Sequence, residues 1–427
     1  MTNYPFYNES WLEIPENSDF PLYNIPFGMA WLPGKKLHAV SRIGDDVIDL
    51  DMLCHSGYFK DINLGVDDCF HQKTLNNFIS LGRETAGKVR TRIAEIFEST
   101  NSTLKDNADL KKQVIIGIDK VKMAMPILPG DYTDFYSSIE HATNVGKMFR
   151  DPANALLPNW RHLPVGYHGR SSSIVVSGTP LHRPMGQVKT NESENPVFIP
   201  TQELDFELEM AFITCNSTKL GDSIPVQQAE DHIFGMVLFN DMSARDIQRW
   251  EYVPLGPFLS KSFGSVISPW IVTMDALEPF RTEGPAQTPE VLPYLKFKGP
   301  KNFDISLEAA IQPEKSVEYI VCKTNFRYMY WNMSQQLAHQ TINGCNINVA
   351  DIYASGTISG PEPGSFGSLL EIAWKGTQPI KLTDGSTRAF LEDGDTMVIR
   401  GYAQKGNLRI GFGDCVTQVL PAIKKIF

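Results

Sequence analysis

Acidic and apolar residues alternate along the segment 205–210, which reads Asp-Phe-Glu-Leu-Glu-Met. Because side chains two residues apart share one face of a β-strand, the pattern predicts that Asp205, Glu207 and Glu209 point to one side and the apolar residues to the other. Carboxylates this close together repel one another unless a positive charge lies among them. The segment therefore fits either a solvated strand face paired with lysine side chains or a site for a hard divalent cation.

A second polar group follows an apolar run that ends just before Asp241. Ser243 could cap a short helix there, and Arg245, Gln248 and Tyr252 would then lie at i, i+3 and i+7 on one helix face. Three hydrogen-bonding side chains would converge beside the strand end at Asp241. A capped surface helix with an Asp–Arg ion pair would explain the same residues equally well.

A histidine stands in a third polar stretch, residues 130–144, which also contains carboxylates and two tyrosines. Histidine exchanges protons near neutral pH, but a single histidine is more often structural, so the segment alone assigns no role to His141. The remaining histidines form neither an H-E-x-x-H motif nor a Cys/His ligand pattern, and this spacing argues against a zinc site.

Charge and motifs disfavour several classes of ligand. The chain has 39 Lys and Arg against 49 Asp and Glu, a net charge of −10, which argues against a nucleic-acid or anionic-membrane surface. It contains no P-loop, no dinucleotide fingerprint and no G-x-S-x-G nucleophile elbow. An anionic ligand would therefore need a local basic site or a bound cation.

Cysteine spacing and the N-terminal sequence bear on the cellular compartment. The 6 cysteines show no C-x-x-C spacing, which fits a reducing environment. The N-terminus lacks a basic region followed by an apolar one, and no apolar run approaches the roughly 18 residues of a membrane span. We therefore expect a cytoplasmic protein.

The first part of the chain reads as a small β unit followed by helix. Strand-like runs at 27–30, 37–41 and 47–50 precede a helical pattern from 72 to 99, with turn residues at 44–46. The stretch 101–112 is polar and linker-like. We predict one domain over residues 1–122 and a second over 123–427.

The rest of the chain reads as a β-rich body with long loops, so the fold class is mainly β with α (α+β). A helix is expected over 325–341, with Met329, Met333 and Leu337 as a core stripe and Asn343-Gly344 as its stop. Asp393-Gly394 is a hairpin-type turn. Strands are expected at 173–176, 204–214, 235–239, 368–374, 388–391 and 396–401.

Six long segments resemble the fumarylacetoacetate hydrolase family: GDYTDFYSSIEHATNVG, LLPNWRHLPVGYHGRSSSIVVSGTP, ELDFELEMAF, FNDMSARDIQRWEYVPLGPFLSKSFG, YASGTISG and GSFGSLLEIAWKG. The likeness covers nearly the whole chain and is strongest over about residues 126–415. It implies a small N-terminal SH3-like barrel, a larger C-terminal β-sandwich roll and a homodimer.

The resemblance also implies a metal site. It carries the family's ligands over to Asp134, Glu207, Glu209 and Asp241, which come from the three polar segments described above. Ligands that are all oxygen suit Mg²⁺ or Ca²⁺ rather than zinc or copper. The same resemblance places a possible second cation near Lys261 and Ser265.

Catalytic roles follow from the resemblance in the same way. His141 becomes the base that activates water, and Glu371, expected on the strand 368–374, becomes its orienting partner. Arg245, Gln248 and Lys261 match donors around the reacting carbonyl. The positions that hold the substrate match Tyr136, Arg150, Tyr167, Gln248, Tyr252 and Thr357.

The implied activity is metal-dependent hydrolysis of the carbon–carbon bond of 4-fumarylacetoacetate to fumarate and acetoacetate, in tyrosine and phenylalanine breakdown. A related chemistry on the same fold, such as acylpyruvate hydrolysis or another reaction of oxo acids, is the alternative. A cation-dependent binding module without catalysis is a third interpretation. His141 and Glu371 argue against it, because ligand binding alone would not need them.

Overall fold

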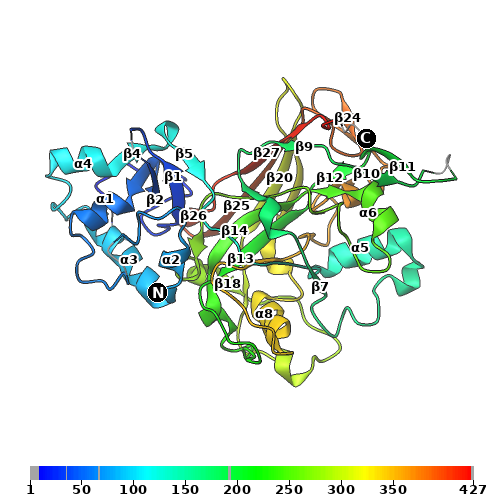
Figure 1. Cartoon of the computed structure of the whole chain (residues 1–427), viewed down its shortest axis with the longest axis horizontal. Coiled ribbons are helices and arrows are strands. Elements are labelled where there is room, and N and C mark those ends of the chain that lie inside the picture. Colours follow the sequence, from blue (N-terminus) through cyan, green and yellow to red (C-terminus); the bar gives the residue numbers. More distant parts are fainter. Residues whose placement is uncertain (1–8, 35, 66–67, 191–193, 425–427) are drawn as a thin grey trace.

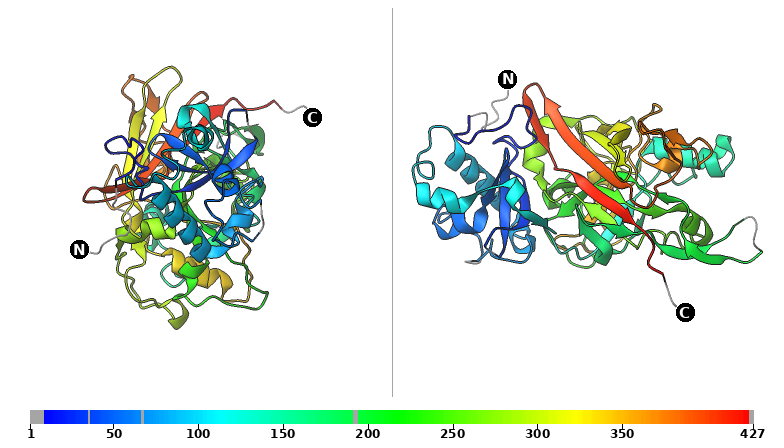
Figure 2. Two further views of the ribbon diagram at one scale, coloured as in Figure 1. Left: turned by 90° about the vertical axis from the view of Figure 1, so that its left-hand side faces the viewer. Right: turned by 90° about the horizontal axis from the view of Figure 1, so that it is seen from above.

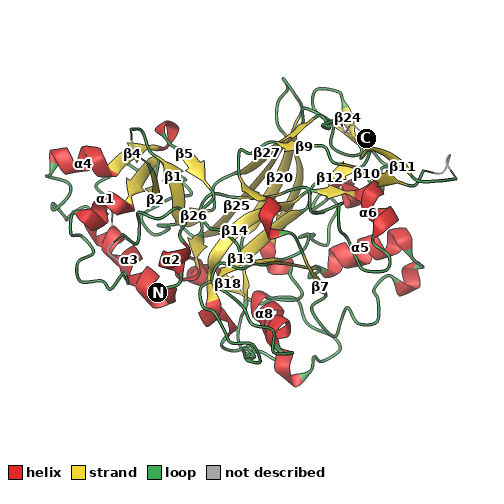
Figure 3. Ribbon diagram, in the orientation of Figure 1, coloured by secondary structure: helices red, strands yellow, loops and turns green. Residues whose placement is uncertain are grey.

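A computed structural model describes residues 9–34, 36–65, 68–190 and 194–424 of the chain. A small unit of strands and helices from the first third of the sequence lies at one end of a larger body (Figures 1 and 2). Strands fill the centre of that body, and most helices lie at its edges (Figure 3). This mixed architecture confirms the predicted fold class.

The small unit is built on a five-stranded antiparallel sheet in the order β4-β3-β2-β1-β5. Its turn at Gly44 needs a residue that tolerates a φ of +55°. The last strand of this sheet along the chain is β5. The predicted domain boundary at residue 122 stays a prediction. The strands are β1 (Phe27–Trp31), β2 (Leu37–Ile43), β3 (Asp46–Asp49), β4 (Ile115–Gly117) and β5 (Lys122–Ala124).

In the described part of this unit, four α-helices accompany the sheet. The expectation of a linker over 101–112 was partly wrong, because a helix begins at Ala108, where the Asn107 side chain accepts a hydrogen bond from the Leu110 N–H. The helices are α1 (Leu50–His55), α2 (Asn76–Ile79), α3 (Gly82–Phe97) and α4 (Ala108–Val114).

The body contains two large sheets. The first has eight strands: β7 (Gly166–His168), β6 (Tyr132–Phe135), β22 (Ile352–Ala354), β13 (Leu208–Thr214), β14 (Ile233–Asp241), β16 (Ser265–Ile267) and β8 (Ile174–Val176) in that order, with β17 (Val272–Thr273) also on β14. The second has β21 (Tyr319–Asn325), β20 (Ser306–Gln312), β25 (Thr396–Lys405), β27 (Cys415–Leu420) and β9 (Leu181–His182), with β26 (Leu408–Gly411) on β25.

Strand β13 is covered on both faces. Met210 and Phe212 pack into a core shared with strands of the second sheet, such as Ile399 on β25. Ala211 and Ile213 pack into a second core shared with the N-terminal unit. The alternative of a solvated strand face is therefore wrong for β13, and any carboxylate on this strand must be satisfied inside the protein.

Short strand pairs and helices complete the body. The pairs are β10 (Met185–Val188) with β11 (Val197–Pro200), β12 (Leu204–Asp205) with β15 (Ser243–Ala244), β18 (Arg281–Thr282) with β19 (Asn302–Phe303), and β23 (Ile380–Lys381) with β24 (Thr387–Arg388). The helices are α5 (Ile139–Phe149), α6 (Arg245–Glu251), α7 (Met274–Leu277), α8 (Met333–Thr341) and α9 (Leu369–Ile372).

Several expected elements differ from the structure. The helix expected from residue 325 begins only at Met333, because Asn332 and Gln335 form a capping box there. The expected strand 204–214 is interrupted at 206–207, and the expected strand 388–391 is reduced to the end of β24. Asp393-Gly394 does not join a hairpin, since β24 pairs with β23 and β25 pairs with other strands. Among the described residues, no helix is long and apolar enough to cross a membrane.

Candidate active site

Four buried carboxylates meet where β6, β13 and β14 lie in one sheet. Asp134 is on β6, Glu207 directly precedes β13, Glu209 is on β13, and Asp241 ends β14. One oxygen from each lies within 4.8 Å of the others, a spacing that could hold a metal ion. We call these four residues the carboxylate cluster.

Sheet register explains how segments so far apart in sequence converge. On β22, Ala354 pairs with Asp134 of β6 on one side and with Ala211 of β13 on the other. Glu209 shares a face with Ala211, two residues away, and therefore approaches Asp134. Sequence patterns showed the acidic alternation, but only the strand order brings β6 to it.

Two cations compensate part of the negative charge. Lys261 Nζ lies 2.7 Å from Glu207 Oε2 and 2.6 Å from Asp241 Oδ2. Arg245 Nη1 donates to Glu207 Oε1 at 2.6 Å. Burial alone would raise the pKa of Glu207, but Lys261 and Arg245 outweigh burial and lower this pKa. Glu207 is thus the member of the cluster that is held as an anion.

At the other three members the effect of burial outweighs the nearby positive charge. Burial, and then the neighbouring Asp241 charge, raise the pKa of Asp134 well above its usual range. Burial and the nearby Asp134 raise the pKa of Glu209 in the same way, and burial raises that of Asp241. Asp134 Oδ1 and Glu209 Oε1 are buried and have no hydrogen-bond partner among the described residues. A hard cation would satisfy both oxygens, so the residues fit a metal ion.

Asp205 lies apart from the cluster. It accepts from Arg245 Nε at 2.8 Å and from the backbone N–H groups of Leu369 and Leu370 at 2.7 and 2.9 Å. The break in the strand after Asp205 turns it toward the first turn of α9. The three acidic residues of the alternating segment therefore divide: two join the cluster, and Asp205 positions Arg245.

His141 and Glu371 form a buried pair. Ser138 caps α5 by accepting from the His141 N–H at 3.2 Å, which fixes His141 in the first turn. His141 Nδ1 lies 2.6 Å from Glu371 Oε2. The expectation that Glu371 sits on a strand was wrong, since it lies on the short helix α9. The pair leaves Nε2 as the imidazole nitrogen available to a ligand.

Sequence analysis missed the side chains that hold Glu371. Asn144 Nδ2 donates to Glu371 Oε1 at 2.9 Å, and the Ser359 and Ser368 hydroxyls donate to Oε2 at 2.8 and 3.1 Å. Burial opposes ionisation, but His141, Asn144 and Ser359 lower the pKa of Glu371. Asn144 stands three residues after His141 on the same helix face, so helix periodicity could have indicated it. Neither serine has a comparable signal.

Residues of both the carboxylate cluster and the His141–Glu371 pair line a cavity of about 530 Å³. Arg245 Nη2 and Thr357 Oγ1 are buried in its wall without a hydrogen-bond partner among the described residues, so both could donate to a ligand. Glu209, Asp241 and Glu371 lie behind the wall. Of the residues expected in the site, the cavity is lined by Asp134, Tyr136, His141, Arg150, Tyr167, Glu207, Arg245, Gln248, Tyr252, Lys261 and Thr357.

Helix α6 presents the predicted face to this cavity, but its cap differs from the prediction. Arg245, Gln248 and Tyr252 all line the cavity. The residue that precedes the helix is Ala244, without a side-chain cap, while Ser243 belongs to β15. Ser243 instead pairs with Asp205 of β12, and the helix begins at Arg245 without a serine cap.

Two of the expected residues have other partners as well. The Arg150 guanidinium donates to the Ala155 carbonyl from Nε and Nη2, at 3.1 and 2.7 Å. Ser265 Oγ lies 2.8 Å from Asp241 Oδ1 and borders a neighbouring pocket together with Lys261. Lys261 Nζ already neutralises the other oxygen of Asp241. The second cation near these residues stays a prediction.

Comparisons with known proteins cover the whole of this architecture. Residues 132–420 match the family model described as Fumarylacetoacetate (FAA) hydrolase C-terminal, and residues 23–126 match Fumarylacetoacetase N-terminal. Fumarylacetoacetase of Homo sapiens is 51% identical over 416 residues, 97% of this chain and 99% of the relative. That of Dictyostelium discoideum is 50% identical over 424 residues, 98% of this chain and 99% of the relative.

Solved structures show the same fold at low identity. A fumarylacetoacetate hydrolase from Exiguobacterium antarcticum superposes with a TM-score of 0.51 at 17% identity, over 93% of this chain and 99% of that chain. A maleylpyruvate hydrolase from a Sphingobium species superposes with a TM-score of 0.50 at 16% identity, over 93% of this chain and 100% of that chain.

Proposed function

The chain belongs to the fumarylacetoacetate hydrolase family, and from this membership we propose that it hydrolyses 4-fumarylacetoacetate to fumarate and acetoacetate. It is thus a hydrolase of carbon–carbon bonds in tyrosine and phenylalanine catabolism. Near-complete coverage of relatives about half identical to it supports this substrate. The observation that carries the mechanism is that His141, held by Glu371, lines the same cavity as Asp134 and Glu207 of the carboxylate cluster.

His141 is the proposed base. With Nδ1 held by Glu371, its Nε2 takes a proton from water, and the resulting hydroxide adds to the carbonyl carbon of the substrate. The carbon–carbon bond then breaks, and its electron pair leaves on the departing carbon as an enolate. Protonation of that carbon gives acetoacetate, so the sum is substrate plus water giving two acids.

The carboxylate cluster is the proposed site of Mg²⁺ or Ca²⁺, held by Asp134, Glu207, Glu209 and Asp241. All four supply oxygen, which both cations prefer. When bound, a divalent ion polarises a carbonyl and stabilises a developing enolate. A second cation near Lys261 and Ser265 is proposed only from the family resemblance.

Donors around the cavity serve the substrate's oxygens and carboxylates. The proposed donors to the reacting carbonyl are Arg245, Gln248 and Lys261. For Arg245 the structure gives a reason, because its buried Nη2 has no hydrogen-bond partner among the described residues and needs an acceptor. Arg150 supplies a positive charge at the cavity for a carboxylate. The side chains proposed to position the rest of the substrate are Tyr136, Tyr167, Gln248, Tyr252 and Thr357.

The alternative, acylpyruvate hydrolysis or a related oxo-acid reaction, is not favoured. Relatives matched over almost their full length are fumarylacetoacetases, and the match includes the N-terminal unit. A binding module without catalysis does not explain why four side chains hold Glu371 in place.

Assembly and location are proposed with the activity. The segment 250–259 beside the cavity exposes apolar side chains, including Leu255 at 95% and Phe258 at 70%, which fits burial against a second copy in a homodimer. We propose a cytoplasmic enzyme, because the 6 cysteines show no C-x-x-C spacing and fit a reducing environment. Light scattering after size-exclusion chromatography tests the dimer.

Loss of the enol absorbance of fumarylacetoacetate tests the function. We expect turnover with Mg²⁺ or Ca²⁺, its loss after chelation, and its return when the cation is restored. Acylpyruvate should be cleaved far more slowly. Turnover of acylpyruvate alone, or turnover that a chelator leaves intact, would reject the proposal.

A further inference from the structure

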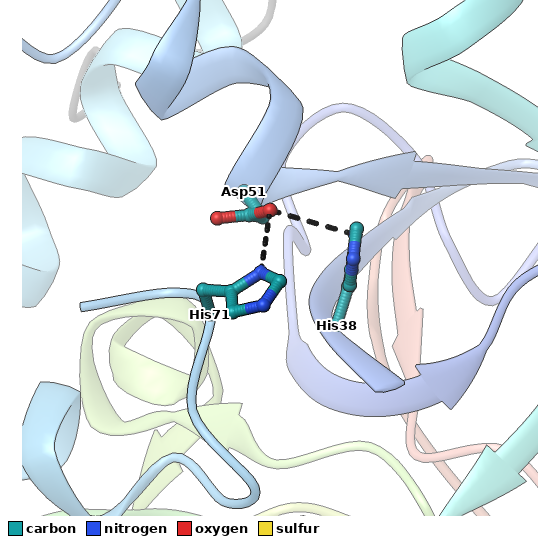
Figure 4. Close-up of side chains that lie close together, drawn as sticks. All are labelled: His38, Asp51 and His71. Carbon is teal, nitrogen blue, oxygen red and sulfur yellow. Dashed lines mark hydrogen bonds and ion pairs between the residues drawn. The ribbon is translucent and has the colours of Figure 1, made fainter. Parts of the chain in front are cut away.

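Two imidazoles and a carboxylate converge in the N-terminal unit, away from the candidate active site. His38 comes from β2, Asp51 from α1, and His71 from the connection between α1 and α2. Figure 4 shows the Asp51 carboxylate with a marked contact to each of the two histidine rings. One ligand atom from each residue lies within 4.8 Å of the others. We call this group the His–Asp cluster.

The separations are close to those of ligands around one metal ion. Asp51 Oδ2 lies 3.1 Å from His71 Nδ1 and 3.7 Å from His38 Nδ1. Zinc bonds of about 2.0–2.2 Å in a tetrahedron place neighbouring ligand atoms about 3.3–3.6 Å apart. Small side-chain shifts would therefore bring all three atoms to bonding distance of a single ion.

Burial and charge at the cluster favour a cation. The side chains of His38 and Asp51 are each only 8% exposed, while His71 is 42% exposed and leaves a route from solvent. His38 Nδ1 is hydrogen-bonded to both oxygens of Asp49, each at 3.1 Å, so a second carboxylate adjoins the first and a metal bond to this nitrogen would replace that hydrogen bond. With neutral imidazoles, Asp49 and Asp51 bring a charge of −2 that one divalent ion would balance.

Asp51 also has an unsatisfied atom. Its Oδ1 is buried and makes no hydrogen bond to the described residues. His55 Nδ1 lies 3.1 Å from this oxygen but makes its hydrogen bond, at 2.9 Å, to the Asp51 backbone carbonyl. His55 is therefore close enough to supply a further ligand after a small rotation.

We propose that the His–Asp cluster binds a zinc-type divalent transition metal through His38, Asp51 and His71. Two imidazoles select such an ion over Mg²⁺ and Ca²⁺, which prefer oxygen. The ligands come from three separate elements, which is why spacing in the sequence argued against zinc. The ion would hold the segment between α1 and α2 against the sheet. This role is structural and remote from catalysis.

Zinc titration of the metal-free, tag-free full chain tests the site, with Mg²⁺ in excess to occupy the carboxylate cluster. We expect one Zn²⁺ per chain by calorimetry. His71→Ala, at a half-exposed position, should weaken this binding about tenfold or more. His162→Ala, at an exposed histidine elsewhere, should leave it unchanged.

Two further measurements locate the ion. Asp51→Asn keeps the shape of a ligand and removes its charge, so it should also weaken Zn²⁺ binding. An anomalous difference peak in zinc-soaked crystals should lie between His38, Asp51 and His71. Unchanged affinity in both variants, or a peak only at the carboxylate cluster, would overturn the proposal and leave a metal-free imidazole–carboxylate cluster.

Discussion

His141 Nδ1 and Glu371 Oε2 lie 2.6 Å apart although 230 residues separate them in the sequence. One comes from the first turn of α5 and the other from the short helix α9. Contact between these helices fixes which imidazole nitrogen faces the cavity. The proposed chemistry therefore depends on helix packing at the edge of the sheet.

Replacing His141 by alanine should abolish turnover and preserve metal binding. The imidazole touches none of the four cluster carboxylates through a hydrogen bond, whereas a positioned base contributes about 10² to 10⁴ in rate. Enol absorbance measures turnover, and calorimetry with Mg²⁺ measures metal affinity. The exposed His162→Ala is the control, and near-normal turnover of the His141 variant would contradict the assignment.

Asn144→Ala should lower kcat roughly tenfold with little change in KM, because Glu371 loses a hydrogen bond to its charged form. Asn144 lowers the pKa of Glu371, so its removal should move the acid limb of the pH profile to higher pH. Lys147→Ala, exposed on the same helix, is the matched control. A fall in kcat without movement of the acid limb would indicate a merely structural role.

Stability should fall in acid partly through Glu371. The lowered pKa of this carboxyl group means that its contribution is complete above the unfolded pKa of about 4.3 and is lost as pH falls through the lower folded value. Glu371→Gln lacks this contribution. The difference in melting temperature between the two chelated proteins should therefore be larger at pH 7 than at about pH 3.

The sequence indicated candidate functional residues more readily than the contacts that hold those residues in position. Alternation at 205–210 grouped Asp205, Glu207 and Glu209 on one strand face, because a strand period of two is visible in one segment. The ligand roles of Glu207 and Glu209 came from the family resemblance and stay predictions. The role of Asp205 could not be predicted, since it depends on α9 folding back onto the strand break. A solvated face was one of the two interpretations of this segment, and it is wrong because the N-terminal unit covers this face of the sheet.

Helix boundaries show a similar limit. Periodicity of Met329, Met333 and Leu337 correctly indicated a core stripe, but the first of these precedes the helix. The capping box at Asn332 and Gln335 decided the true start. For the His–Asp cluster no local pattern existed, because only the fold brings its residues together.

Asp241→Ala should remove the cation from the carboxylate cluster. Without this carboxylate the cluster loses a ligand and Lys261 loses one of its two partners, so the ammonium group can compete with the ion for Glu207. Titration with Mg²⁺ and Ca²⁺ should show affinity at least about tenfold weaker. Asp231→Ala, at an exposed position, serves as the comparison, and equal affinity in the two variants would argue against the assigned ligand.

Gly356→Ala should disrupt both stability and the site. Gly356 has a φ of +76°, and an added Cβ would lie 2.1 Å from the Phe135 carbonyl oxygen. Its N–H also donates to Glu209 Oε2 at 3.0 Å, so any backbone shift moves a cluster carboxylate. Positive φ and overpacking together should cost about 2 to 4 kcal/mol.

The control is Gly34→Ala. Gly34 has a similar φ of +66° with open space around it, so this substitution should cost only about 1 to 2 kcal/mol. Urea denaturation of both variants separates steric overlap from backbone strain. Equal losses of unfolding free energy would show that Gly356 matters only for its φ. A larger loss in Gly356→Ala, together with weakened Mg²⁺ binding, would tie the close approach to Phe135 to the geometry of the cluster.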